Sequence, residues 1–497
     1  MSEGPSAVQG VQFREQDGKR SSQLVGKTVY SDAARGVDEA LASRIENQGA
    51  WRKSYLGPVR ELVEAGARSA TNATRIAQDG LASAHSSLMF RRADTEVPVH
   101  AAFSTFPAER FETATIKGSG DRERQLVVPF EGRHLSGDAL LQRLDRWVET
   151  GIIEPSCREA VASVVAEPDW LDLSGTRFVL MGAASEMGPL ESLTRWGAEV
   201  IAIDLPRPEL WARILKVAEQ GSGVVHVPVP SPHDGDLGSL ARLAGADLLT
   251  ETPEIRTWVA SFGGPMVVGN YVYADGSTFL RLATALDALT SSLQDDVSDV
   301  SIAYLATPTD VFAVPQEVVD ASRARARSKI AVLPRAISKG AVFQPNYRST
   351  VRSDDGATWG ISDVLVPQQG PNYSLAKMMQ RWRAIEAKRQ GRLVSANVAP
   401  ATKTRSVVKN KVLAAAFRGA SAFGVEVFAP ETSRALMSAL LAHDLRNPTA
   451  AAQPSVELGH PFELFTQGAA HGGLWRIAYE PRSVLPLAVG FGIVRRG

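Results

Sequence analysis

Cysteine is nearly absent from this sequence, which contains a single one, Cys157. A lone cysteine excludes an internal disulfide and any metal site built from clustered thiolates. His460 and His471 stand eleven residues apart, without a nearby cysteine or helical glutamate, and so are not a metal pair. They are expected on loops near the substrate end or at a subunit contact. The sequence therefore fits a reducing, cytoplasmic compartment and predicts no bound metal.

An excess of either charge is also lacking, because 54 Lys and Arg residues balance 54 Asp and Glu residues. Without a basic stripe interleaved with aromatic residues, nucleic acid is not an expected partner. The first ten residues lack the charged start and apolar run of a signal peptide, so secretion is not expected.

Long apolar runs are missing as well. No run reaches the roughly 20 residues that span a bilayer. The nearest, residues 484–494, is about half that length and contains Pro486 and two glycines. A buried C-terminal strand or an interface segment is expected there, and no membrane span is predicted.

The length of 497 residues allows two or three domains. Residues 1–170 are expected to form a mainly helical N-terminal extension that caps the following domain or helps form an oligomer. Within it, residues 1 to about 50 read as a loose or peripheral polar arm, and residues 57–90 have helical spacing with one apolar face. Residues 171–450 are expected to form the main domain, and residues 451–497 to complete it or an interface.

The stretch 176–204 predicts a strand, a glycine turn, a helix and a second strand. The run 177–181 is short and apolar, which is typical of a strand buried on both faces of a parallel sheet. Gly182 ends it at a sharp turn, and Gly188 stands at the expected helix start, where a missing side chain lets backbone approach a pyrophosphate. Asp204, about 20 residues past the turn, can accept hydrogen bonds from ribose hydroxyls. The alternative is an ordinary strand–helix–strand unit without a nucleotide.

Further strands are expected at residues 224–229, 265–271 and 300–306, with helices between them. This alternation predicts an α/β fold with a doubly wound, Rossmann-like parallel sheet. About 60 residues then intervene before the next helix. This insertion, residues 310–370, is expected to act as a lid or substrate wall, and its segment 340–344 could pair as an extra strand.

Tyr373 and Lys377 are four residues apart and therefore share one face of a predicted helix. A neighbouring ammonium favours a phenolate, so Lys377 is expected to lower the pKa of Tyr373 toward the working range of an acid or base.

The spacing of Tyr373 and Lys377 resembles the Tyr-x-x-x-Lys motif of the short-chain dehydrogenase/reductases. The glycine turn is similar to that family's Gly-x-x-x-Gly-x-Gly turn, with Glu186 in place of the middle glycine. The segment 391–404 resembles its sixth strand and Pro-Gly loop, with Ala401 in place of the glycine, and residues 429–441 resemble its late helix opening with Pro-Glu. The resemblance spans about residues 174–445.

The resemblance implies a nicotinamide cofactor and assigns residues to it. Asp247 would meet the adenine ring, or else complement a helix dipole. Asn270 would stand for the family's Asn-Asn-Ala-Gly strand end, and Lys377 would also grip the nicotinamide ribose. The implied cofactor-binding residues are Gly182, Ser185, Met187, Gly188, Asp204, Asp247, Asn270 and Lys377.

The family's active-site hydroxyl has three candidates. Thr307 and Thr309 directly follow the expected fifth strand, whereas Ser362 stands about a dozen residues before Tyr373. Ser362 is preferred, because a chain that returns from an insertion could supply the hydroxyl at the usual distance from the tyrosine. The alternative for Ser362 is an ordinary turn serine.

The sequence thus predicts an NAD(P)-dependent oxidoreductase that interconverts a carbonyl and an alcohol on a small to medium, acyl or polyketide-like substrate, with Tyr373, Lys377 and Ser362 as catalytic residues. NAD is favoured because Asp204 repels a 2′-phosphate, although Arg207 could hold the phosphate of NADP. Alternatives are a non-catalytic nucleotide sensor or scaffold on the same fold, and an epimerase or dehydratase that retains its cofactor. A homo-oligomer is expected.

Overall fold

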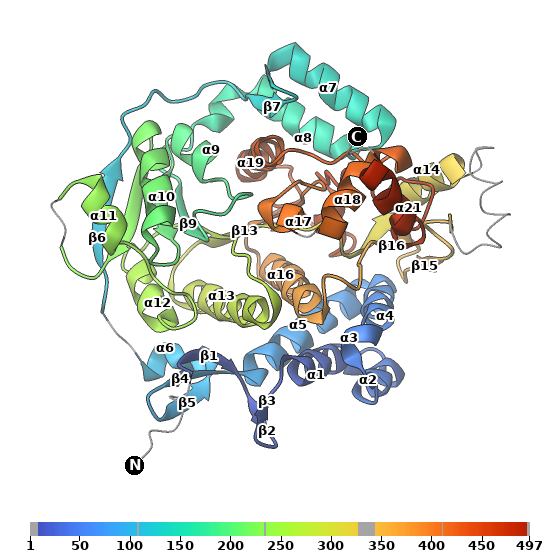
Figure 1. The fold of residues 1–497 in the computed structure, drawn as a ribbon, viewed down its shortest axis with the longest axis horizontal. Coiled ribbons are helices and arrows are strands. Elements are labelled where there is room, and N and C mark those ends of the chain that lie inside the picture. The colour runs from blue at the N-terminus through green and yellow to red at the C-terminus, as the bar shows by residue number, and fades with distance from the viewer. Residues whose placement is uncertain (1–7, 107–108, 233–234, 327–342, 410, 495–497) are drawn as a thin grey trace.

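The structure, a computed structural model, describes residues 8–106, 109–232, 235–326, 343–409 and 411–494. The centre of the fold is a seven-stranded sheet with the strand order β17-β13-β12-β9-β10-β11-β6 (Figure 1). Neighbouring strands are parallel, apart from β11 and β6, which are antiparallel. The strands are β6 (Glu112–Lys117), β9 (Arg177–Met181), β10 (Glu199–Ile203), β11 (Val224–Val229), β12 (Met266–Asn270), β13 (Val300–Ala306) and β17 (Val394–Val398). The predicted Rossmann-like α/β fold is confirmed.

Helices cover both faces of this sheet (Figure 1). Along β9, Phe178 and Leu180 belong to one apolar cluster, whereas Val179 and Met181 belong to another. Because alternate side chains of a strand point to opposite faces, β9 is buried on both, as its sequence predicted. One face packs on α8 (Pro155–Ala166), α10 (Pro208–Gln220) and α19 (Pro430–Arg446), and the other on α12 (Thr252–Ala260), α13 (Gly276–Asp296) and α16 (Pro371–Arg389).

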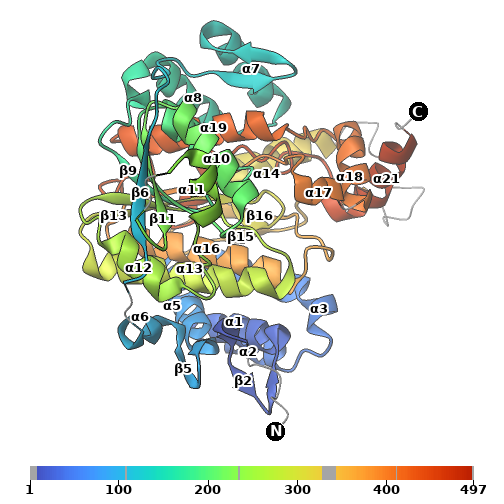
Figure 2. The ribbon, with the colours of Figure 1, turned by 60° about the vertical axis from the view of Figure 1, so that its left-hand side comes forward.

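Residues 8–106 lie against the outer side of α16 (Figure 2). Trp382 of α16 packs on Gly80, where a Cβ atom would lie 2.4 Å from the indole ring. The Tyr30 hydroxyl lies 2.9 Å from Ser374 Oγ. The expected loose arm is wrong for the described residues up to 50, because their apolar side chains, Val29 and Tyr30 among them, are buried against this helix layer.

Two helices replace the single one expected over residues 57–90. The Ser69 side chain accepts the Asn72 N–H and so begins a new helix. The elements of this N-terminal part are β1 (Gly10–Phe13), β2 (Glu15–Gln16), β3 (Lys19–Arg20), α1 (Ser22–Arg35), α2 (Glu39–Glu46), α3 (Trp51–Ser54), α4 (Leu56–Ala67), α5 (Ala70–Ser87), β4 (Leu88–Arg92), β5 (Thr95–Pro98), the 3-10 helix Val99–Ala101 and α6 (Ala102–Thr105).

The insertion contributes a three-stranded antiparallel sheet in the order β14-β16-β15. Its elements are β14 (Val311–Pro315), α14 (Gln316–Ala326), β15 (Thr350–Arg352) and β16 (Thr358–Asp363). The extra strand predicted at residues 340–344 lies mostly outside the described residues.

The apolar segment 484–494 is helical, so the strand expected there is wrong. It belongs to α21 (Pro481–Val494), which packs on α18 (Lys411–Gly419). A Cβ atom at Gly419 would lie 1.9 Å from the Ala488 carbonyl oxygen, so the glycine lets the two backbones approach closely. No helix within the described ranges is long and apolar enough to cross a membrane.

The remaining elements connect these layers. They are β7 (Val128–Phe130), β8 (Arg133–Leu135), α7 (Gly137–Thr150), α9 (Leu190–Arg195), α11 (Leu237–Leu243), α17 (Arg405–Lys409), α20 (Glu463–Thr466) and the 3-10 helices Pro168–Leu171 and Ala420–Phe423.

Candidate functional site

Asp204 follows β10 directly and holds the glycine turn after β9. Its Oδ2 accepts the Ala184 N–H at 2.8 Å, and its Oδ1 accepts the Leu205 N–H at 2.9 Å. Burial raises the pKa of this carboxyl, whereas the two N–H groups and the nearby Arg213 and Arg207 act to lower it. A carboxylate has about four lone-pair sites, so two remain for ribose hydroxyls. The free acceptor sites of Asp204 therefore fit the ribose hydroxyls of a dinucleotide.

Both glycines of the turn lie where other parts of the chain leave little or no room for a side chain. Gly182 has φ +81°, and a Cβ atom there would lie 3.0 Å from the Val272 nitrogen. A Cβ atom at Gly188 would lie 3.3 Å from Ser185 Cβ. Met187 packs on the neighbouring apolar cluster. Helix α9 begins at Leu190, two residues later than expected, so backbone contact of this turn with a pyrophosphate stays a prediction.

Glu186, which stands in place of the family's middle glycine, links the turn to the segment after β17. Its Oε2 accepts the backbone N–H of Arg405 at 2.9 Å. Arg434 of α19 donates to the Glu186 carbonyl at 3.3 Å and forms an ion pair with Glu191 at 2.6 Å. The carboxylate is thus bound to the start of α17.

Asp247 and Asn270 lie at the same edge of the sheet. The N–H of Ala246 donates to the Asp204 carbonyl at 2.9 Å, which places Asp247 beside the turn. Asp247 Oδ1 accepts the Leu249 N–H at 2.8 Å, so the carboxylate stabilises its own loop. Asn270 ends β12, and its Oδ1 accepts the Val272 N–H at 3.4 Å. These hydrogen bonds do not test whether Asp247 or Asn270 contacts a cofactor.

Tyr373 and Lys377 occupy the first two turns of α16, which begins with Pro371, a residue suited to the start of a helix. The Tyr373 ring lies 5.6 Å from the Phe279 ring and 6.3 Å from the Tyr273 ring. Lys377 Nζ donates to the Leu305 carbonyl at 3.3 Å, at the carboxyl end of β13.

Burial has the largest effect on the pKa values of Tyr373 and Lys377. It raises the pKa of Tyr373 to about 12; Asp310 acts in the same direction and a hydrogen bond with Thr307 opposes it. Burial lowers the pKa of Lys377 to about 8, against the attraction of Asp310. The expected lowering of the Tyr373 pKa is therefore wrong for this structure. A phenol with this pKa keeps its proton at neutral pH, which suits a general acid.

Among the three candidate hydroxyls, Thr307 is the one that the structure brings to Tyr373. Thr307 Oγ1 lies 3.0 Å from Thr309 Oγ1, which also accepts from Gln369 Nε2 at 3.0 Å. Ser362 lies on β16 opposite Phe312, fully buried, in the sheet of the insertion. The insertion thus returns Ser362 to its own sheet rather than to the tyrosine.

Asp310 was missed by sequence reasoning. Its side chain is 1% exposed and forms an ion pair at 3.1 Å with Arg381 of α16. Burial raises the pKa of this carboxyl, and Arg381 opposes the rise. Its position just after a strand end, beside Thr309, was a signal that could have identified it.

The loop after β12 connects the glycine turn with Tyr373. Tyr271 donates its N–H to the Met181 carbonyl at 2.9 Å, and Tyr273 in the same loop contacts the Tyr373 ring. A Cβ atom at Gly269 would lie 2.7 Å from the Tyr271 ring, so this ring covers the end of β12. The turn and the tyrosine therefore share the carboxyl edge of the sheet. No spacing in the sequence indicated the aromatic contacts that Tyr271 and Tyr273 make here.

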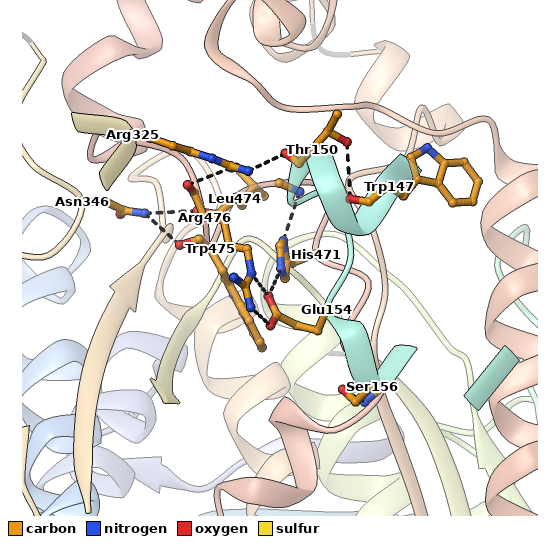
Figure 3. A network of polar contacts seen from close by, with 12 residues as sticks. Trp147, Thr150, Glu154, Ser156, Arg325, Asn346, His471, Leu474, Trp475 and Arg476 are labelled. Carbon is orange, nitrogen blue, oxygen red and sulfur yellow. Dashed lines mark hydrogen bonds and ion pairs between the residues drawn. The ribbon is translucent and has the colours of Figure 1, made fainter. Parts of the chain in front are cut away.

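A second polar cluster consists of Glu154, His471 and Arg476 (Figure 3). Glu154 and His471 are buried, and the Arg476 side chain is 15% exposed. Glu154 accepts from His471 Nε2 at 2.8 Å and from Arg476 Nε at 2.8 Å and Nη2 at 2.5 Å. His471 lies on a loop, as expected, but it is buried in the interior rather than exposed at a subunit contact. No group of three or more potential metal ligands occurs in the part of the chain that the structure describes.

Comparison with known proteins gives little similarity. No protein-family model and no curated protein matches this sequence. One similar solved structure is that of the angucycline C-6 ketoreductase LanV with bound NADP, which is 14% identical. The match covers 61% of this chain and 97% of that chain, with a TM-score of 0.32, and it assigns no role to any residue here.

Proposed function

We propose that this protein is an NAD(P)-dependent oxidoreductase that interconverts a carbonyl and an alcohol. The observation that supports this most is the joint position of Tyr373, Lys377 and Thr307 on the sheet edge that also carries the Asp204 turn. Asp204 would hold the adenosine ribose, with the turn residues beside the phosphates. When bound, the nicotinamide supplies or accepts the hydride.

The chain's own part in the reduction is to bind the carbonyl oxygen and deliver a proton to it. Tyr373 holds that proton at neutral pH and would donate it as the alcohol forms. The phenolate left behind is stabilised by the ammonium of Lys377, which lies one helical turn away. Thr307, the candidate hydroxyl nearest to Tyr373, would orient the same oxygen. Asp310 is a positioning residue that favours the charged form of Lys377.

The parts of the chain receive roles within this proposal. Residues 171–450 form the catalytic unit, with the insertion 310–370 as a wall of the substrate site. Within the extension 1–170, residues 8–106 cap α16, whereas β6 adds to the central sheet and α8 packs on its other face. Residues 451–497 complete the unit. NAD is the proposed cofactor, and NADP is the alternative because Arg207 and Arg213 face Asp204. A cytoplasmic homo-oligomer acting on a small to medium acyl or polyketide-like molecule is part of the proposal.

The change Asp204→Ala should raise the Kd of NADH by about tenfold or more, because a hydrogen bond to a charged group contributes roughly 1.5–3 kcal/mol. Titrations with NADH and NADPH, followed by quenching of tryptophan fluorescence, measure this. Glu209→Ala removes an exposed carboxylate from the nearby start of α10 and is the matched control. Binding that Asp204→Ala and Asp204→Asn both leave unchanged would contradict the assigned site.

The changes Thr307→Ala and Ser362→Ala distinguish the two candidate hydroxyls. We expect Thr307→Ala to lower kcat by about 10²-fold, because it removes the group bonded to Tyr373. Ser362→Ala should leave kcat within about twofold, since its side chain is buried in another sheet. Carbonyl-dependent oxidation of the reduced cofactor is the measurement. The opposite order of the two effects would restore Ser362 as the active-site hydroxyl.

A nucleotide sensor or scaffold without turnover is the second candidate. The Tyr271 ring favours it, because it covers the end of β12, which the resemblance places beneath the cofactor. A sensor would bind NAD(H) and would tolerate loss of the Tyr373 hydroxyl, whereas an enzyme would not.

A further inference from the structure

Three helical segments project from the body of the molecule on one side (Figure 2). They are α17, α18 and α21, together called the projection. Five of the nine large apolar side chains that are exposed among the described residues lie on it. They are Val408, Val412, Phe491, Ile493 and Val494, of which Val494 is 79% exposed. Such a concentration of exposed apolar side chains marks an interaction surface.

The crossing of α18 and α21 is formed by small residues. Helices α18 and α21 cross where Gly419 faces the Ala488 carbonyl and Gly492 faces the Ala415 carbonyl, with room for no Cβ atom at either glycine. The small residues thus form the contact between the helices. Among the large side chains, the Phe491 ring does reach Phe423, at 5.9 Å, yet stays half exposed.

The projection is also basic. Residues 401–425 contain five basic residues and no acidic one. They are Lys403, Arg405, Lys409, Lys411 and Arg418. The chain as a whole is neutral, so this charge is local. A basic surface with exposed aliphatic and aromatic side chains combines the two features that bind anionic membrane surfaces.

We propose that the projection binds the surface of an anionic lipid bilayer. Its exposed aliphatic and aromatic side chains would enter the boundary between headgroups and acyl chains, and Lys409 and Lys411 would contact lipid phosphates. Helix α21 has 14 residues and is too short to span the bilayer, so the projection lies on the surface. A second copy of the chain is a poorer partner, because two basic surfaces repel each other.

This surface lies next to the proposed site. Arg405, the first residue of α17, donates its N–H to Glu186 in the glycine turn. A membrane-bound projection would therefore hold the proposed site at the bilayer.

Flotation of the full chain with vesicles tests the proposal without substrate or nucleotide, so its outcome is independent of reductase activity. The protein should float with vesicles of equimolar phosphatidylcholine and phosphatidylglycerol, and not with phosphatidylcholine alone. Each lysine near an anionic surface contributes a factor of about five, so Lys409→Gln/Lys411→Gln should weaken binding about 25-fold. Phe491→Ser/Ile493→Ser should weaken it at least tenfold.

Matched controls keep the result specific. Arg124→Gln/Lys216→Gln removes the same charge from exposed positions elsewhere, and Val8→Ser/Leu24→Ser removes exposed apolar side chains. Both should bind vesicles like the unchanged protein. No flotation, equal binding to neutral vesicles, or equal losses in variants and controls would overturn the proposal. Self-association that is abolished by Phe491→Ser/Ile493→Ser would overturn it in favour of a second copy of the chain.

Discussion

Replacing Tyr373 by phenylalanine is expected to lower kcat by about 10²–10⁴-fold, the range that a positioned general acid contributes. The phenylalanine ring preserves the contacts with Phe279 and Tyr273 and removes only the hydroxyl. The Kd for NADH should change by less than about twofold, because the ribose is held from Asp204. Carbonyl-dependent cofactor oxidation and fluorescence titration measure the two quantities on one protein preparation.

Tyr273→Phe is the control for the change at Tyr373. Its hydroxyl bonds to Asp275 at 2.8 Å, and its ring is in the same aromatic group, yet no proton transfer is assigned to it. Turnover should therefore survive this change. If Tyr373→Phe kept full turnover, the proton would come from another group. Nucleotide binding without any carbonyl-dependent turnover in the unchanged protein would favour the sensor.

The sheet was predictable from the sequence because its strands are short, apolar and buried on both faces. The predicted strand 300–306 has the bounds of β13, and 177–181 has those of β9. The helix of Tyr373 was predictable because Pro371 and helical spacing mark its start. These signals are local, so one sequence was enough to find them.

The identity of the active-site hydroxyl and the pKa of Tyr373 depend on contacts between residues that are far apart in the sequence. Thr307 meets Tyr373 across 66 residues, and spacing alone favoured Ser362. The pKa of Tyr373 follows from burial more than from the charge one helical turn away. That burial comes from the whole fold, including the N-terminal residues that pack on α16, which the sequence had suggested were loose in part.

Helix α21 shows another limit of local patterns. Two glycines and a proline within a short apolar run disfavour a helix. Here Gly492 serves the crossing with α18, whose small residues stand about 70 positions earlier. A partner helix therefore decides the structure of the segment.

Glu154→Gln is expected to destabilise the protein at pH 7 by about 3 kcal/mol, and by less as the pH falls. Glu154 is 4% exposed and bonds to both His471 and Arg476 (Figure 3). Burial alone would raise the pKa of this carboxyl, but the two partners outweigh burial and lower the pKa to about 2. A glutamate titrates near 4.3 when unfolded, and one pKa unit corresponds to about 1.4 kcal/mol, which gives the expected magnitude.

The sign of the pH dependence follows from the lowered pKa. The ionised Glu154 contributes its stability in full above about pH 4.3, and that contribution is lost as the pH falls toward 2. The difference between the unchanged protein and Glu154→Gln in the midpoint of urea unfolding should therefore be about half as large at pH 3 as at pH 7. Glu149→Gln, at an exposed position of α7, should show no difference at either pH. If the difference for Glu154→Gln were equal at both pH values, packing around the side chain would hold residues 154 and 476 together. The charge of Glu154 would then not be the cause of its stabilising effect.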